Sequence, residues 1–337
     1  MTRLSPTALQ ALTYHGGDVA AAARLFPDAP KPWIDLSTGI NPEPYPAPPL
    51  PPAVWTRLPD VAALAKLEQV AAERYGARPE SVVAGPGSQA LLQVLARLAP
   101  RGSVGALKPT YGGYADAFGA AGLWVTTADS LAGLADRAVA VVANPNNPDG
   151  RTVALDRLID LHASLAARGG WMIVDEAFAD FDAGASLAPV LPERGAVALR
   201  SFGKTYGLAG LRLGFAIASP DIAAPLRAAL GPWAVSGPAL AIGAEALADS
   251  AWLAATAVRL AADCARLDAL LAANGWRVVG GTRLFRLAAG KDAASAFLRL
   301  LAAGILTRPF ADRPDSLRFG IPGEEAHWRR LAAALDS

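Results

Sequence analysis

The segment WMIVDEAF, residues 171–178, carries the pattern that decides the fold. Its first four residues predict a short strand that runs into the interior, and Asp175 and Glu176 stand at the carboxyl end of that strand. A buried charge without a partner is very costly, so these carboxylates must be paired or exposed. Because ligands of parallel sheets bind at the carboxyl ends of strands, this strand end is a candidate site.

Similar apolar segments recur along the chain and alternate with helical patterns. Helices are expected at 61–75, 88–98 and 155–167, and strands at 81–85, 103–107, 123–127, 138–143, 171–174, 196–202 and 213–218. This alternation predicts an α/β fold in which helices cover both faces of a mostly parallel sheet.

The chain changes character at both ends. Residues 42–52, PEPYPAPPLPP, predict an extended crossing, because proline removes amide donors and fixes φ. After about residue 238 we expect one long helix rich in alanine and leucine that ends at Ala273, followed by a smaller α+β module. The predicted organisation is an N-terminal arm with part of a small domain at 1–44, a large domain at 45–237, and a small C-terminal domain at 238–337.

Composition excludes several classes of partner. The 31 Lys and Arg residues balance 30 Asp and Glu residues, so neither nucleic acid nor an anionic membrane is an expected partner. Gly-Pro pairs interrupt the longest uncharged run, 228–244, whereas a membrane-spanning helix needs about 20 apolar residues. The single cysteine, Cys264, excludes an internal disulfide. We expect a soluble, cytoplasmic protein.

Four of the predicted strands end in unusual polar segments. These are GPGSQA at 85–90, NPNNPDG at 144–150, DEAF at 175–178 and SFGKTYGLAGLRLG at 201–214. Polar residues that converge from separate strand ends indicate one common site.

The segment GPGSQA fits the pattern G-x-G-x-x-G/A between a strand and a helix. It predicts either a phosphate held by amides at a helix N-terminus or an ordinary tight turn. A nicotinamide dinucleotide also needs an acidic residue about 20 positions on. Residues 102–115 contain none, so a phosphate without a dinucleotide fits better.

Lys204 lies in a glycine-rich loop beside Ser201 and Arg212. A lysine in a partly desolvated site can form a Schiff base with an aldehyde, although a solvated loop lysine is the alternative. Ser201 and Arg212 would bind a phosphate, and Asp175 would supply an anion for a ring nitrogen. Pyridoxal 5'-phosphate has these three groups.

The lysine segment S-F-G-K-x-x-G-L-A-G-x-R-x-G resembles that of the fold type I pyridoxal-phosphate enzymes, the aspartate aminotransferase superfamily. NPNNPDG is similar to the family's NPNNPTG, and VDEAF is similar to its VDEAY. The resemblance covers essentially the whole chain with the motifs in the family's order. It implies a large domain that binds pyridoxal 5'-phosphate, a smaller second domain, and a homodimer.

The resemblance also implies roles for individual residues. Lys204 would be the Schiff-base lysine, Asp175 would pair with the pyridinium nitrogen, and Tyr111 of KPTYGGY would stack on the ring. Asn147 would bond the phenolic oxygen. The cofactor phosphate would be held by Gly87, Ser88, Gln89, Ser201 and Arg212.

The substrate, a phosphorylated amino acid, would be bound by His15, Gly39, Asn41, Asn147, Arg308 and Arg318. Arg318 would take the α-carboxylate, and His15 and Arg308 the phosphate. The alternatives to these binding roles are that Arg318 is an arginine of an edge strand and that His15 is a capped residue of the arm.

Two subfamilies share this motif set, the histidinol-phosphate aminotransferases and the threonine-phosphate decarboxylases of cobalamin synthesis. YHGGDVAAAARLFP at 14–27, WIDLSTGINPEPYP at 33–46 and GILTRPF at 304–310 resemble the second. The expected reaction is therefore decarboxylation of L-threonine O-3-phosphate, with an aminotransferase for histidinol phosphate or a related amino acid as the alternative. A regulator that carries the cofactor without catalysis is a third possibility, against which the intact set of Lys204, Asp175, Asn147 and Arg212 argues.

Three residues bear on details of this assignment. Phe178 stands where aminotransferases usually have Tyr, which would leave Asn147 as the sole donor to the phenolic oxygen. Leu58 stands where relatives commonly have a Tyr that reaches the neighbouring subunit's cofactor phosphate, so that contact is in doubt. Glu176 is expected to bond either loop amides or solvent.

Overall fold

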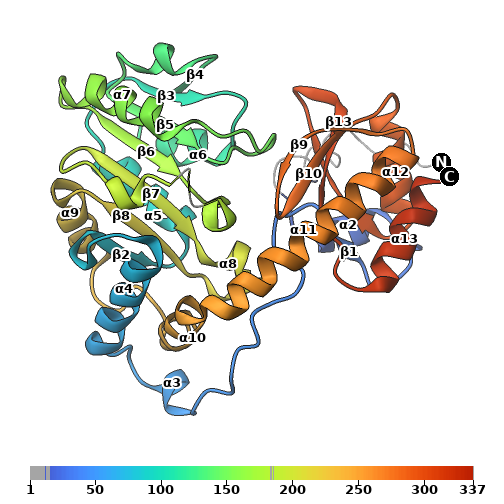
Figure 1. The fold of residues 1–337 in the computed structure, drawn as a ribbon, viewed down its shortest axis with the longest axis horizontal. Helices are drawn as coiled ribbons and strands as arrows, with labels where there is room; N and C mark the ends of the chain where they lie inside the picture. Colours follow the sequence, from blue (N-terminus) through green and yellow to red (C-terminus); the bar gives the residue numbers. More distant parts are fainter. Residues whose placement is uncertain (1–11, 13–15, 183, 185, 337) are drawn as a thin grey trace. The chain divides into compact units, whose positions relative to one another are not determined.

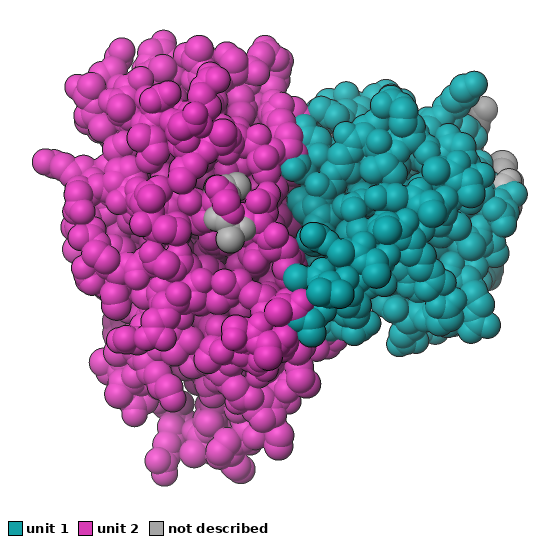
Figure 2. Space-filling model, in the orientation of Figure 1, with its two compact units in different colours: residues 1–43, 148–150, 255–337 teal, residues 44–147, 151–254 magenta. Residues whose placement is uncertain are grey.

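The computed structural model describes residues 12, 16–182, 184 and 186–336. The chain forms two compact units, coloured separately in Figure 2. Unit 1 comprises residues 1–43, 148–150 and 255–337, and unit 2 comprises residues 44–147 and 151–254. The domain boundaries expected after residues 44 and 237 stay predictions, because compactness in one structure does not test independent folding.

Unit 2 is built on a seven-stranded sheet with the order β2-β8-β7-β6-β5-β3-β4 (Figure 1). Six strands run parallel, and β8 is antiparallel to both of its neighbours, β2 and β7. The predicted mostly parallel α/β sheet is confirmed. The strands are β2 (Val82–Gly85), β3 (Val104–Leu107), β4 (Val125–Ala128), β5 (Val139–Ala143), β6 (Trp171–Asp175), β7 (Ala196–Ser201) and β8 (Gly214–Ala218).

Both faces of this sheet are buried except at the edge strand β4, where Thr126 and Thr127 are exposed, because successive side chains of the other strands enter different cores. In β6, for example, Met172 and Val174 join one core cluster and Ile173 joins the other. The first cluster includes residues of α4 (Val61–Tyr75), α7 (Leu155–Ala166) and α10 (Gly237–Ala248). The second includes residues of α5 (Ser88–Leu98), α6 (Gly113–Ala120) and α9 (Pro220–Leu230). Short helices α3 (Ala53–Thr56) and α8 (Phe202–Thr205) complete the unit.

The expected long helix does end at Ala273, but the prediction that it runs unbroken from about residue 238 is wrong. Two helices occupy this region, α10 and α11 (Ser250–Ala273), and Asp249 separates them with φ −82° and ψ 79°. The Asp249 carboxylate accepts a hydrogen bond from the Trp252 amide at 2.8 Å, which caps the new helix. Alanine and leucine continue across the break, so composition alone does not reveal it.

Unit 1 contains a four-stranded antiparallel sheet with the order β12-β13-β10-β9. Its strands are β9 (Arg277–Thr282), β10 (Phe285–Ala289), β12 (Arg308–Phe310) and β13 (Arg313–Gly320). A parallel pair, β1 (Ile34–Asp35) with β11 (Ile305–Leu306), joins the N-terminal segment to the C-terminal one. The helices are α2 (Val19–Leu25), most of α11, α12 (Ala293–Ala302) and α13 (Glu325–Leu335). Among the residues that the model describes, no helix is both long and apolar enough to cross a membrane.

Candidate active site

Four parallel strands of unit 2 end at the same edge of the sheet. In the register, Ala143 of β5 is level with Asp175 of β6. Ser201 of β7 and Gly85 of β2 are both level with Gly214 of the intervening β8. The four polar segments predicted to converge therefore do start from one edge.

The loop after β2 is shaped around Arg212. Gly87 has φ +93°, and a Cβ built on it would lie 2.7 Å from Arg212 Nη2, so a side chain there would collide with the guanidinium group. A Cβ on Gly214 would likewise overlap the Ser88 amide nitrogen. Helix α5, which begins at Ser88, has no side chain that caps its N-terminus. A cation beside an uncapped helix N-terminus is suited to a phosphate.

Lys204 lies on the short helix α8, directly after β7. Its Nζ donates to Ser201 Oγ at 3.3 Å and lies 5.2 Å from the centroid of the Phe178 ring. Lys204 is half-buried, and Phe178 is buried. The amine therefore lies at the sheet edge in a partly apolar setting, as a Schiff-base lysine requires.

Asp175 is held by hydrogen bonds to both carboxylate oxygens. Oδ1 accepts from the Ala177 amide at 3.1 Å, and Oδ2 accepts from the Tyr114 hydroxyl at 2.7 Å. The predicted stacking residue, Tyr111, donates to Gln89 Oε1 at 3.3 Å and meets the Tyr114 ring edge to face, with 5.6 Å between centroids. Tyr114, the second tyrosine of KPTYGGY, was not among the predicted site residues.

The loop that carries Asn147 is fixed on both sides. Asn144 accepts from the Val153 amide at 2.8 Å and donates to the Val153 carbonyl at 3.1 Å, which closes the loop at its base. Asn146 donates to the Pro109 carbonyl at 2.8 Å. The loop is therefore tied to the segment that carries Tyr111.

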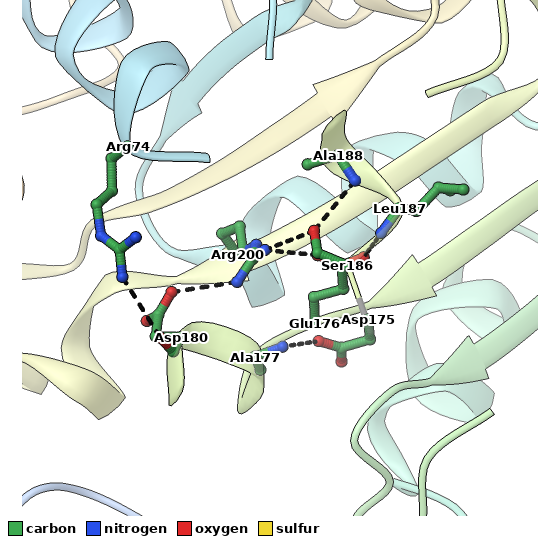
Figure 3. Close-up of polar contacts among 9 residues, drawn as sticks. All are labelled: Arg74, Asp175, Glu176, Ala177, Asp180, Ser186, Leu187, Ala188 and Arg200. Atoms are coloured by element: carbon green, nitrogen blue, oxygen red, sulfur yellow. Dashed lines mark hydrogen bonds and ion pairs between the residues drawn. The ribbon is translucent and has the colours of Figure 1, made fainter. Parts of the chain in front are cut away.

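Glu176 belongs to a buried ion-pair network behind the strand end (Figure 3). It accepts from the Ser186 hydroxyl at 2.8 Å and the Leu187 amide at 2.6 Å, and it pairs with Arg200 at 2.9 Å. Arg200 also pairs with Asp180 at 3.1 Å. Burial alone would lower the pKa of Arg200, but Glu176 and Asp180 raise it above its usual value. Of the two expectations for Glu176, the bond to a loop amide is the one observed.

In unit 1, Arg308 of β12 and Arg318 of β13 are directly opposite cross-strand partners. Arg318 is buried, and its Nη2 donates to the Ser37 carbonyl at 2.6 Å, two residues before Gly39. Burial, together with the positive charge of Arg308, lowers the pKa of Arg318 to about 9, so it remains a cation at neutral pH. Like charges opposite one another destabilise a sheet, and a bound anion would relieve this.

Asn41 is buried, and its side-chain oxygen accepts from Arg259 Nη2 at 2.7 Å and from the Glu43 amide at 3.2 Å. Both partners can only donate, so they fix which end of the amide is oxygen and which is nitrogen. Arg259 also pairs with Glu43 at 3.1 Å and Asp263 at 3.2 Å. Arg259 was not among the predicted site residues. His15 lies outside the described residues.

Leu58 is 69% exposed and lines a hollow of about 660 Å³ between α3, α4 and α10, whose walls include both apolar and charged side chains. Trp55, Val61 and Trp233 are also more than half exposed. Such exposed apolar side chains favour a covered surface in an assembly.

Residues 53–335 match the family model described as aminotransferase class I and II. The match covers most of the chain, which therefore belongs to this family.

Two curated relatives carry the name threonine-phosphate decarboxylase. The chain is 43% identical over 324 residues to one from Pseudomonas aeruginosa, covering 95% of this chain and 96% of the relative. It is 42% identical over 325 residues to one from a Sinorhizobium species, covering 95% and 97%. A histidinol-phosphate aminotransferase from Mesorhizobium japonicum is 32% identical over 298 residues, covering 80% of each chain.

Solved structures show the same fold. The histidinol-phosphate aminotransferase from Sinorhizobium meliloti, in complex with pyridoxal-5'-phosphate, superposes with a TM-score of 0.81 at 22% identity, covering 99% of this chain and 97% of the other. A histidinol-phosphate aminotransferase from Clostridium acetobutylicum has a TM-score of 0.78 at 21% identity, covering 90% and 98%. The predicted fold type I architecture is confirmed.

Proposed function

We propose that this protein is a pyridoxal-phosphate-dependent carboxy-lyase. It would convert L-threonine O-3-phosphate to (R)-1-amino-2-propanol O-2-phosphate in cobalamin biosynthesis. The observation that carries this proposal is the 42–43% identity to two threonine-phosphate decarboxylases over 95% of the chain. The histidinol-phosphate aminotransferase from Mesorhizobium japonicum is less similar, at 32% over 80%.

The residues at the sheet edge of unit 2 fit pyridoxal 5'-phosphate. The space over Gly87 beside Arg212, at an uncapped helix N-terminus, suits its phosphate, with Ser88, Gln89 and Ser201 as further ligands. Lys204 would hold it covalently through Nζ, Tyr111 would stack on it, and Asn147 would bond its phenolic oxygen. When bound, the cofactor supplies an electron sink for the pair of electrons released as the bond from Cα to the carboxylate breaks.

Each of the chain's own groups then has a defined task. Asp175, whose two oxygens each accept a hydrogen bond, would pair with the protonated ring nitrogen. Lys204 Nζ or water would return a proton to Cα. Phe178 has no hydroxyl, so Asn147 alone would bond the phenolic oxygen. This loss of one hydrogen bond is worth roughly 0.5–1.5 kcal/mol and does not by itself select the reaction.

Unit 1 would supply the substrate's anion ligands. The substrate carries two anionic groups, and the opposed Arg308 and Arg318 place two cations on neighbouring strands. Arg318 would bind the α-carboxylate and Arg308 the phosphate. Asn41 would donate from its side-chain nitrogen, because its oxygen is already an acceptor for Arg259. Gly39 and His15 stay predicted members of this set.

The test is to incubate the protein and pyridoxal 5'-phosphate with L-threonine O-3-phosphate and to measure CO2 and the phosphorylated amino alcohol. A parallel reaction contains 2-oxoglutarate and is assayed for glutamate. We expect CO2 in both and no glutamate, and Lys204→Ala should abolish the reaction. Transfer of the amine without CO2 would establish the alternative, an aminotransferase for histidinol phosphate or a related amino acid.

We also propose that the protein is a cytoplasmic homodimer. The exposed apolar side chains of Trp55, Leu58 and Val61, close together along the chain at α3 and the start of α4, support a partner of the same kind. Sedimentation analysis should give twice the chain mass, and Leu58→Asp should weaken the association. A monomer over the whole range of micromolar concentrations would refute it.

A further inference from the structure

Tyr114 contacts the candidate active site but was not among the predicted site residues. It is the second residue of α6, is 1% exposed, and packs in the same core cluster as Phe118 and Ile173. Its hydroxyl donates to Asp175 Oδ2 at 2.7 Å. Burial and the Asp175 carboxylate raise the pKa of Tyr114 well above its usual value, so the hydroxyl keeps its proton and remains a donor.

The local sequence is built to bring Tyr114 to this position. A Cβ on Gly113 would overlap the Tyr111 ring, so glycine at the first position of α6 lets the Tyr111 ring lie against the start of the helix. The rings of Tyr111 and Tyr114 then meet edge to face at 88°. One short segment therefore delivers a ring to the candidate stacking position and a hydroxyl to the carboxylate.

The bond completes the support of Asp175. The Ala177 amide donates to Oδ1 and Tyr114 donates to Oδ2, so the two oxygens are held from separate elements. Donors to a carboxylate stabilise its charged form and fix its orientation. A carboxylate that must face a ring nitrogen needs both properties.

We propose that Tyr114 is a positioning residue that holds the Asp175 carboxylate oriented toward the cofactor ring nitrogen. This inference rests on the proposed function, because it requires Asp175 to face pyridoxal 5'-phosphate. The competing explanation is that Asp175 merely satisfies a buried tyrosine hydroxyl. The two explanations differ in their prediction for removal of the Tyr114 hydroxyl, which changes the properties of the bound cofactor only if Tyr114 positions Asp175.

The test compares Tyr114→Phe with Tyr75→Phe in the full chain loaded with pyridoxal 5'-phosphate. Tyr75 is a matched control, because it is also buried in unit 2, but its hydroxyl has no hydrogen-bond partner among the described residues. In Tyr114→Phe we expect a changed visible absorbance spectrum of the bound cofactor and a fall in kcat of about tenfold with less than a twofold change in KM. Tyr75→Phe should match the wild type in both.

A double-mutant cycle with Asp175→Asn tests whether Tyr114 acts through the carboxylate. The Tyr114→Phe effects on the spectrum and on the cofactor's dissociation constant should largely disappear in the Asp175→Asn background. Equal effects in both backgrounds, or a wild-type spectrum in folded Tyr114→Phe protein, would overturn the inference. Because these readings need no substrate, they stand apart from the test of decarboxylation. Failure of the wild-type protein to bind the cofactor would instead refute the proposed function.

Discussion

Arg200 and Arg318 are both buried guanidinium groups, 4% and 6% exposed, yet their surroundings act on them in opposite directions. Arg200, on β7 of unit 2, pairs with Glu176 and Asp180, and these carboxylates raise its pKa. Arg318, on β13 of unit 1, donates to a backbone carbonyl and faces Arg308 across the sheet, and its pKa is lowered. Two carboxylates outweigh the effect of burial on Arg200, whereas Asp35 offsets only part of the effect of burial and of Arg308 on Arg318.

The difference separates a structural charge from a candidate binding charge. Removing one partner of a buried ion pair leaves the other charge buried and uncompensated, which lowers the free energy of unfolding. A buried cation whose charged form is disfavoured is stabilised when an anion binds beside it.

Replacement of Arg200 should cost the most. Arg200→Met leaves Glu176 and Asp180 buried without their cation, and we expect the free energy of unfolding to fall by about 3–5 kcal/mol. Urea and thermal unfolding of the cofactor-free protein measure it. Arg266→Met is the control, because its pair with Glu325 is exposed and should matter far less. Equal losses in both variants would show that the buried network is not structural.

Replacement of Arg318 should have the reverse profile. Arg318→Met should lower kcat/KM for threonine phosphate by about 10²–10³-fold, because truncating one partner of a charged contact costs roughly 2–5 kcal/mol. The unfolding midpoint should stay unchanged or rise, since a disfavoured buried cation is removed. Steady-state kinetics and thermal unfolding on the same preparation decide it. A destabilised variant with normal kinetics would contradict the comparison.

Arg308 should govern recognition of the phosphate. Arg308→Met should reduce the preference for threonine phosphate over threonine by about tenfold or more, because a hydrogen bond to a charged group contributes about 1.5–3 kcal/mol. Competition between the two compounds measures this ratio directly. An unchanged ratio would mean that other residues recognise the phosphate.

The smallest effect is expected at Arg259, which orients the Asn41 amide. Arg259→Leu should raise KM for threonine phosphate by about two- to tenfold with little change in kcat, as expected for one hydrogen bond of about 0.5–1.5 kcal/mol. Asp263→Ala removes a different partner of Arg259 and serves as the control. If both variants raise KM equally, the effect is not specific to Asn41.

Much of the site could be predicted from the sequence because its residues stand at strand ends. Asp175, Asn147, Ser201 and Lys204 follow apolar strands in short motifs, and parallel strands bring such positions to one edge. Tyr114, Arg200 and Arg259 were not predicted as site or network residues. Their partners lie 61, 24 and 218 positions away along the chain, and no local pattern links residues at such separations.

The break between α10 and α11 at Asp249 was also not predicted from the apolar pattern of the sequence. Apolar residues continue from α10 into α11, and the break depends on a single capping carboxylate and a non-helical φ and ψ.

By itself the sequence determined the alternation of helix and strand, the family motifs and the lysine that would carry the cofactor, because periodicity and short motifs are local properties. Only the tertiary structure decided which charges are compensated. Arg200 and Arg318 both stand in apolar strands and look alike along the chain. Packing placed two carboxylates beside one and a second arginine beside the other, and the energy of a buried charge depends on those neighbours.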